Sequence, residues 1–141
     1  KHAPINGDNG VYHRFGSVNY DVFKKFNERL KSVSWRFINT TAGGDTPMAD
    51  GIQFALNALS NRNEVNRFVF VVTDGKPDNG HTEVINHQTR MAKRSQINII
   101  GVGIGNEAKY VQTTFHDSVW SMKMSEFPRL LVAKLNELAT R

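Results

Sequence analysis

The sequence predicts an α/β domain with a doubly wound, mostly parallel sheet flanked by helices. Two continuous apolar runs carry this prediction: residues 67–73, read as RFVFVVT, and residues 97–105, read as INIIGVGIG. Runs of this kind are typical of strands that are covered on both faces. A stretch with helical periodicity lies between them, and strands alternating with helices indicate a layered α/β structure.

The first elements come before these runs. Val11 to Phe15 reads as a short strand. After it, apolar side chains recur at spacings of three and four, which predicts an amphipathic helix that buries one face. That face consists of Tyr20, Phe23, Phe26, Leu30 and Val33.

The next helix is expected to begin at Thr46 and Pro47, because a threonine can cap free N–H groups and proline suits the first helical position. Its buried stripe is Met48, Ile52, Ala55, Leu56 and Leu59. The strand at residues 67–73 then follows, and we expect it in the middle of the sheet.

The remaining elements alternate in the same way. A helix is expected at residues 82–94, with Val84, Ile85, Gln88, Met91 and Ala92 facing inward, and the strand at 97–105 follows it. Residues 117–122 are a candidate edge strand. A closing helix is expected at residues 127–139, with Pro128 in its first turn and with Leu131, Leu135 and Leu138 buried.

Two loops of this arrangement carry oxygen side chains. Asp74 follows the strand at 67–73 directly, in TDGKPDN, and Thr46 lies in TAGGDTPMADG at a helix start. Ligands of a doubly wound sheet bind where such loops converge, and a hard cation such as Mg²⁺ favours carboxylate and hydroxyl ligands. The simpler alternatives are that Thr46 only caps its helix and that Asp74 only stabilises a turn.

The two motifs together, GGDTPM and a buried strand ending in TDG, resemble the von Willebrand factor type A family, which has a Rossmann-like fold. The resemblance implies a metal-ion-dependent adhesion site. In it, Thr46 binds the cation directly and Asp74 binds it directly or through a water. A carboxylate from a protein partner then takes the open position, which describes a binding module and not an enzyme.

The sequence departs from the family pattern in two ways. No DxSxS sequence is present, although this segment supplies three ligands in the family, so the first strand and helix of the fold are expected to be missing. We therefore expect residues 1–141 to be a single, N-terminally incomplete domain that holds Mg²⁺, Mn²⁺ or Ca²⁺ weakly. The chain starts at Lys1, and the missing segment is expected upstream.

The second departure is Asp45, which enlarges the usual GGTP to GGDTP. Asp45 is a further metal ligand, a hydrogen-bond acceptor that orients a ligand, or only a loop residue. The candidate metal ligands are therefore Thr46, Asp74 and Asp45.

Within the family, YHRFGS, GGDTPMADGI and the closing helix look like cobaltochelatase-type and magnesium-chelatase subunits, including phage ones. This resemblance implies an AAA+ ATPase as the partner. The chain has no cysteine and no apparent signal peptide, from which a cytoplasmic protein is expected.

Other classes of function have less support. A Mg²⁺-dependent phosphotransfer enzyme, with Asp74 as ligand or nucleophile, would need a phosphate loop, and no GxxxxGK[ST] sequence is present. The net charge of +5 permits nucleic-acid binding through basic helices, but a charged helix face is more often simply solvated. No apolar run is long enough to cross a membrane, and no membrane partner is expected. GVGIG lacks the spacing of a dinucleotide loop, and the histidines, as surface residues or polar core edges, lack zinc-ligand spacing.

Overall fold

The computed structural model of the protein describes residues 5–6, 11–12, 18–38, 40 and 46–140. Its strands are β1 (Ile5–Asn6), β2 (Val11–Tyr12), β3 (Arg67–Thr73), β4 (Ile97–Ile104) and β5 (Asp117–Ser121). The α-helices are α1 (Leu30–Val33), α2 (Met48–Ser60), α3 (His81–Arg94), α4 (Val111–Thr114) and α5 (Phe127–Ala139). Three short 3₁₀ helices are η1 (Ser34–Phe37), η2 (Glu107–Tyr110) and η3 (Met124–Glu126).

The main sheet confirms the predicted α/β class. Within the described residues it has three parallel strands in the order β3–β4–β5, with Val69 beside Ile99 and Val102 beside Val119. Strand β4 lies in the middle and is the most buried of the three. Strands β1 and β2 form a separate antiparallel pair, so the predicted strand at 11–15 is seen over Val11–Tyr12 and its remainder lies outside the described residues.

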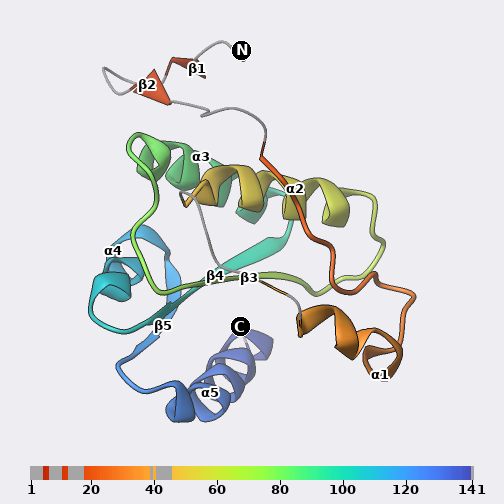
Figure 1. Ribbon diagram of the computed structural model, residues 1–141. Helices are drawn as coiled ribbons and strands as arrows, with labels where there is room; N and C mark the ends of the chain where they lie inside the picture. Colours follow the sequence, from red (N-terminus) through yellow and green to blue (C-terminus); the bar gives the residue numbers. More distant parts are fainter. Residues whose placement is uncertain (1–4, 7–10, 13–17, 39, 41–45, 141) are drawn as a thin grey trace.

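Helices cover both faces of this sheet (Figure 1). On one face, α2 and α3 pack on β3 and β4 around a core that includes Ile52, Ile85 and Ile99. On the other face, α5 packs through Phe127 on Ile100 and Val102 of β4. The two apolar runs predict burial on both faces, which holds for β4, whereas Val69 is the one buried residue of β3.

The second half of the chain follows the sequence prediction closely. Helix α3 begins one residue before its predicted start, and α5 has its predicted bounds, with Pro128 in its first turn. Among the described strands, β5 lies at an edge of the sheet, as expected. Of the expected inward residues, Met91 is exposed, while Leu131 and Leu138 are partly buried against the core. No helix in the described residues has the length and apolar character needed to cross a lipid bilayer.

The glycines of β4 are explained by packing. A Cβ on Gly103 would lie 2.5 Å from the backbone oxygen of Ala108, and a Cβ on Gly101 would lie 2.2 Å from the ring of Phe115. Gly105 ends the strand with a φ of +82°, a conformation that glycine adopts without steric cost. GVGIG therefore lets η2 and α4 lie directly on the sheet.

The predicted helix over residues 20–33 is wrong for most of its length. Only Leu30–Val33 is α-helical, and residues 18–25 have no regular structure. This segment crosses α2 on its way to α1 (Figure 1). Tyr20 stacks on Phe54 of α2 at 4.5 Å between ring centroids, while Phe23 stacks on Phe37 of η1. The two aromatic rings thus have different partners, and the Asn, Asp, Val and aromatic residues at its start are modest helix formers.

The expected mid-sheet position of β3 is also wrong for the described residues. Within the part of the chain that the structure describes, strand β3 pairs with β4 alone, so its other edge is open there. Phe70 and Val72 are 39% and 60% exposed there. An open apolar edge is a liability in a parallel sheet.

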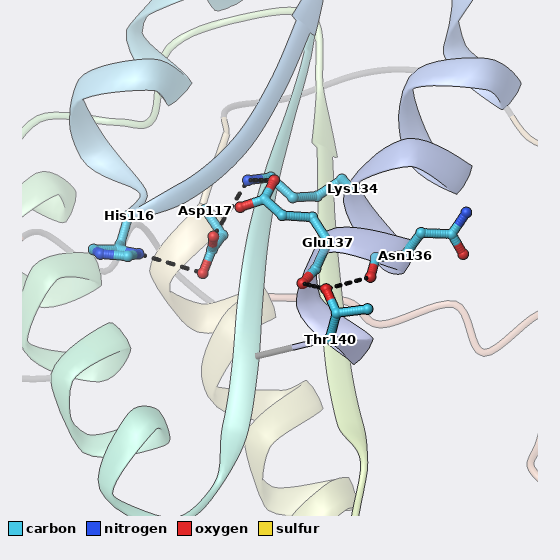
Figure 2. A network of polar contacts seen from close by, with 6 residues as sticks. All are labelled: His116, Asp117, Lys134, Asn136, Glu137 and Thr140. Carbon is cyan, nitrogen blue, oxygen red and sulfur yellow. Dashed lines mark hydrogen bonds and ion pairs between the residues drawn. The ribbon is translucent and has the colours of Figure 1, made fainter.

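A polar network fastens α5 to the start of β5 (Figure 2). The Lys134 ammonium lies 3.3 Å from Asp117 Oδ1 and 2.9 Å from Glu137 Oε2, and His116 Nδ1 lies 3.3 Å from Asp117 Oδ2. The Lys134 and Asp117 side chains are only 15% and 12% exposed, so this ion pair is held largely out of water.

Candidate metal-binding rim

Thr46 lies immediately before α2, but it does not cap the helix as expected. Pro47 occupies the cap position, and the helix begins at Met48. The Thr46 hydroxyl makes no hydrogen bond among the described residues. The simpler alternative for Thr46, a helix cap, is therefore not what its side chain does here.

Asp74 lies just past the end of β3, in an exposed position. The turn there is made by its neighbour: the Thr73 hydroxyl donates to the Gly75 carbonyl at 2.7 Å and accepts from the Gly75 N–H at 3.2 Å. The Asp74 carboxylate has no hydrogen bond or ion pair among the described residues. The simpler alternative for Asp74 was that its side chain stabilises this turn, but Thr73 does so instead.

Asp78 joins the two loops, and sequence reasoning missed it. Its Oδ1 accepts a hydrogen bond from the Thr46 N–H at 2.9 Å, and its own N–H donates to the Thr46 carbonyl at 3.2 Å. The two residues are 32 positions apart. The available sequence signal was an aspartate in TDGKPDN, which does not reveal a partner so distant along the chain.

His81 makes a second link between the same elements. It is 1% exposed, and its Nδ1 accepts from the Ala49 N–H at 3.1 Å, so it supplies a partner for a free amide in the first turn of α2. Burial holds the pKa of His81 below its ordinary value, although Asp78 and Asp50 act in the opposite direction. The ring is therefore neutral near pH 7, which leaves Nδ1 able to accept.

Thr46 and the end of β3 line one groove, of about 330 Å³, between α2 and the open edge of β3. Beside it, the Tyr110 hydroxyl lies 3.4 Å from the Met48 sulfur. Burial raises the pKa of Tyr110, and a hydrogen bond with Thr73 partly opposes this. Tyr110 thus contacts both the start of α2 and the end of β3. Residues 46–47 before α2 (the threonine loop) and residues 74–80 after β3 (the strand-end loop) therefore belong to one local structure.

The donor set at this rim suits a hard cation. A hydroxyl and a carboxylate are ligands of the kind that Mg²⁺, Mn²⁺ and Ca²⁺ prefer. In the part of the chain that the structure describes, no group of three or more His, Cys, Asp or Glu residues could hold a metal ion. Asp45, the third candidate, lies outside the described residues. Thr46 and Asp74 alone would make a weak site.

A family model described as the von Willebrand factor type A domain matches residues 8–115, which is most of the chain. The match includes the threonine loop, α2, β3, α3 and β4. A search of curated proteins found no match.

Proposed function

Because the chain belongs to the von Willebrand factor type A domain family, we propose that it is a protein-binding module that works through a divalent cation. In this proposal the Thr46 hydroxyl and the Asp74 carboxylate hold the ion, and Asp45 is a third candidate ligand. A carboxylate of the partner protein completes the coordination. The ion gives the contact strength and a preference for acidic partners.

One observation carries the proposal: two loops distant in the sequence meet at one rim, and their Thr46 hydroxyl and Asp74 carboxylate have no hydrogen bond among the described residues. The Asp78 hydrogen bond to Thr46 and the shared groove support the convergence. The turn contacts of Thr73 support the availability of Asp74. The Asp74 carboxylate, just past the carboxyl end of a parallel strand, is in the usual place for a ligand of such a sheet.

A non-catalytic role is part of the proposal. Among the described residues, the His81 imidazole beside the rim is buried, and its Nδ1 accepts from the Ala49 N–H. A general base must reach the proton that it removes, and this ring is held by the backbone instead. Binding without chemistry is thus the function that this arrangement supports best.

We further propose that a strand and ligands from outside the described residues complete the domain along β3. The open edge of β3, its exposed Val72 and the groove beside it support this. The DxSxS segment of the family is the expected source, upstream in the native polypeptide. A completed set of ligands would hold the ion more tightly than Thr46 and Asp74 can.

For the partner we propose an AAA+ ATPase, in a complex of the chelatase type. The resemblance of YHRFGS and GGDTPMADGI to such subunits is the support for this assignment. In such a complex the domain would bind an acidic residue on the ATPase ring.

The test is a pull-down from the native source with the full-length polypeptide, in Mg²⁺ and in chelator. Thr46→Ala and Asp74→Ala are compared with matched exposed controls, Thr113→Ala and Asp21→Ala. We expect capture to require Mg²⁺ and to be lost in the two rim variants alone. Capture that persists in chelator and in both rim variants would refute the adhesion-site function. A captured partner without an ATPase domain would refute the chelatase assignment.

A further inference from the structure

We infer that Asp78 is a positioning residue, which holds Thr46 at the rim before any ion binds, while His81 holds the first turn of α2 that follows Thr46. The inference rests on the proposed function for its consequence, since it concerns the residue that presents the threonine ligand. It assigns a role to a carboxylate that the candidate ligand set leaves out.

The contact between Asp78 and Thr46 is reciprocal. The Asp78 side chain accepts from the Thr46 N–H at 2.9 Å, and the Asp78 N–H donates to the Thr46 carbonyl at 3.2 Å. Both backbone polar groups of Thr46 are therefore bonded to Asp78, and the Thr46 carbonyl also accepts from the Met48 N–H at 2.7 Å. A hydrogen bond to a carboxylate is stronger than one between neutral groups, so the side-chain bond is the larger part of this restraint.

The same residue also ties the rim to α3. The Asp78 carbonyl accepts from the His81 N–H at 3.1 Å, at the first residue of that helix. From there the His81 ring reaches back to the Ala49 N–H in α2. Asp78 and His81 thus close a loop of hydrogen bonds that runs from the threonine loop to the strand-end loop, to α3 and back to α2.

The consequence is preorganisation. The Thr46 backbone is held from both sides while its hydroxyl stays free among the described residues. An ion that binds there does not have to order the loop first, which removes part of the entropic cost of binding. Groups behind the ligands commonly change metal affinity by about 10-fold to 100-fold when they are replaced.

The experiment compares Asp78→Ala, Asp78→Asn and the control Asp21→Ala in the full chain. An asparagine oxygen can still accept from the Thr46 N–H, while alanine cannot. Two quantities are measured: hydrogen exchange of the Thr46 amide by NMR, without metal, and Mn²⁺ affinity by electron paramagnetic resonance.

We expect Asp78→Ala to speed Thr46 amide exchange on the order of 10-fold, as a local opening would, and to weaken Mn²⁺ binding about 10-fold or more. Asp78→Asn should retain most of both, and Asp21→Ala should change neither. Unchanged Thr46 exchange in Asp78→Ala would overturn the inference. So would equal losses of Mn²⁺ affinity in Asp78→Asn and Asp78→Ala, because the charge and not the hydrogen bond would then matter.

The two proposals fail separately. If the wild-type chain and the full-length polypeptide bind no Mn²⁺, the proposed function fails, and the exchange measurement alone decides whether Asp78 positions Thr46. If the wild type binds Mn²⁺ while Asp78→Ala binds it equally well, the inference fails and the proposed function stands.

Discussion

The substitution Gly103→Ala tests how closely η2 lies on the sheet. The added Cβ would be 2.5 Å from the Ala108 backbone oxygen and 2.9 Å from a methyl carbon of Val111. Neither neighbour can turn away as a long side chain would, because one is backbone and the other is fully buried. Strand β4 cannot retreat either, since it is paired on both edges.

The cost follows from this geometry. Forcing one extra carbon into a well-packed core costs about 1–3 kcal/mol. For 141 residues the entropy of unfolding is roughly 300 cal/mol/K, so each kcal/mol lowers Tm by about 3 °C. We therefore expect Gly103→Ala to lower Tm by about 3–10 °C, measured by circular dichroism, with a matching loss in urea denaturation.

Gly51→Ala is the matched control. Gly51 lies inside α2, and a Cβ there would meet no atom within 4 Å. Replacing a helical glycine by alanine should raise stability by about 0.5–1 kcal/mol. A Gly103→Ala protein with a Tm at or above that of the wild type would refute the close-approach explanation of GVGIG.

Three further predictions concern other contacts. Burial holds the pKa of His81 below 6.5 in the folded protein. Between that lower pKa and 6.5 the unfolded chain therefore binds more protons than the folded one. The free energy of unfolding should be highest above pH 6.5 and should decrease as the pH falls below it. Urea denaturation between pH 7 and 5 should show this slope, and His81→Gln should flatten it. Val72→Lys should reduce self-association through the open edge of β3, measured by sedimentation velocity. Lys134→Met should cost about 1.5–3 kcal/mol, because it removes a charged partner from a mostly buried carboxylate.

Each of these has a control or a contrary outcome. A pH slope in His81→Gln as steep as in the wild type would assign it to other groups. Val65→Lys changes a residue that is 82% exposed and outside the strand, so an equal effect there would mean that charge alone prevents association. Glu137→Gln removes the exposed partner of Lys134 and should be nearly neutral. Equal losses in both variants would contradict the ranking by burial.

The sequence predicted those elements whose pattern is decided locally. Strands β3 and β4 are long apolar runs, and α5 has a proline in its first turn and a leucine stripe, so composition and spacing suffice for them. The helix predicted over residues 20–33 failed because the same spacing can also arise from aromatic residues that have separate partners. Tyr20 lies against α2 and Phe23 against η1, and a periodicity argument does not distinguish this from one helical face.

The candidate site was predictable only in part. Thr46 and Asp74 were marked by a helix start and by the end of a buried strand, which are local signals. Asp78 and His81 act on residues 32 positions away, on backbone amides that carry no side-chain signature. His81 was expected at the surface or at the edge of the core, and its near-complete burial depends on how α2 meets α3.

The seam between α2 and α3 limits how the two helices can move. Gln88 donates to the Ala49 carbonyl at 2.9 Å and to the Gln53 side chain at 3.2 Å, while His81 accepts from the Ala49 amide. Apolar contacts between helices tolerate sliding. These hydrogen bonds form at one relative position of α2 and α3, however, and a shift by one turn would leave buried polar groups unpaired. If a ligand displaces the threonine loop, we therefore expect α2 and α3 to move over the sheet together, as one rigid body.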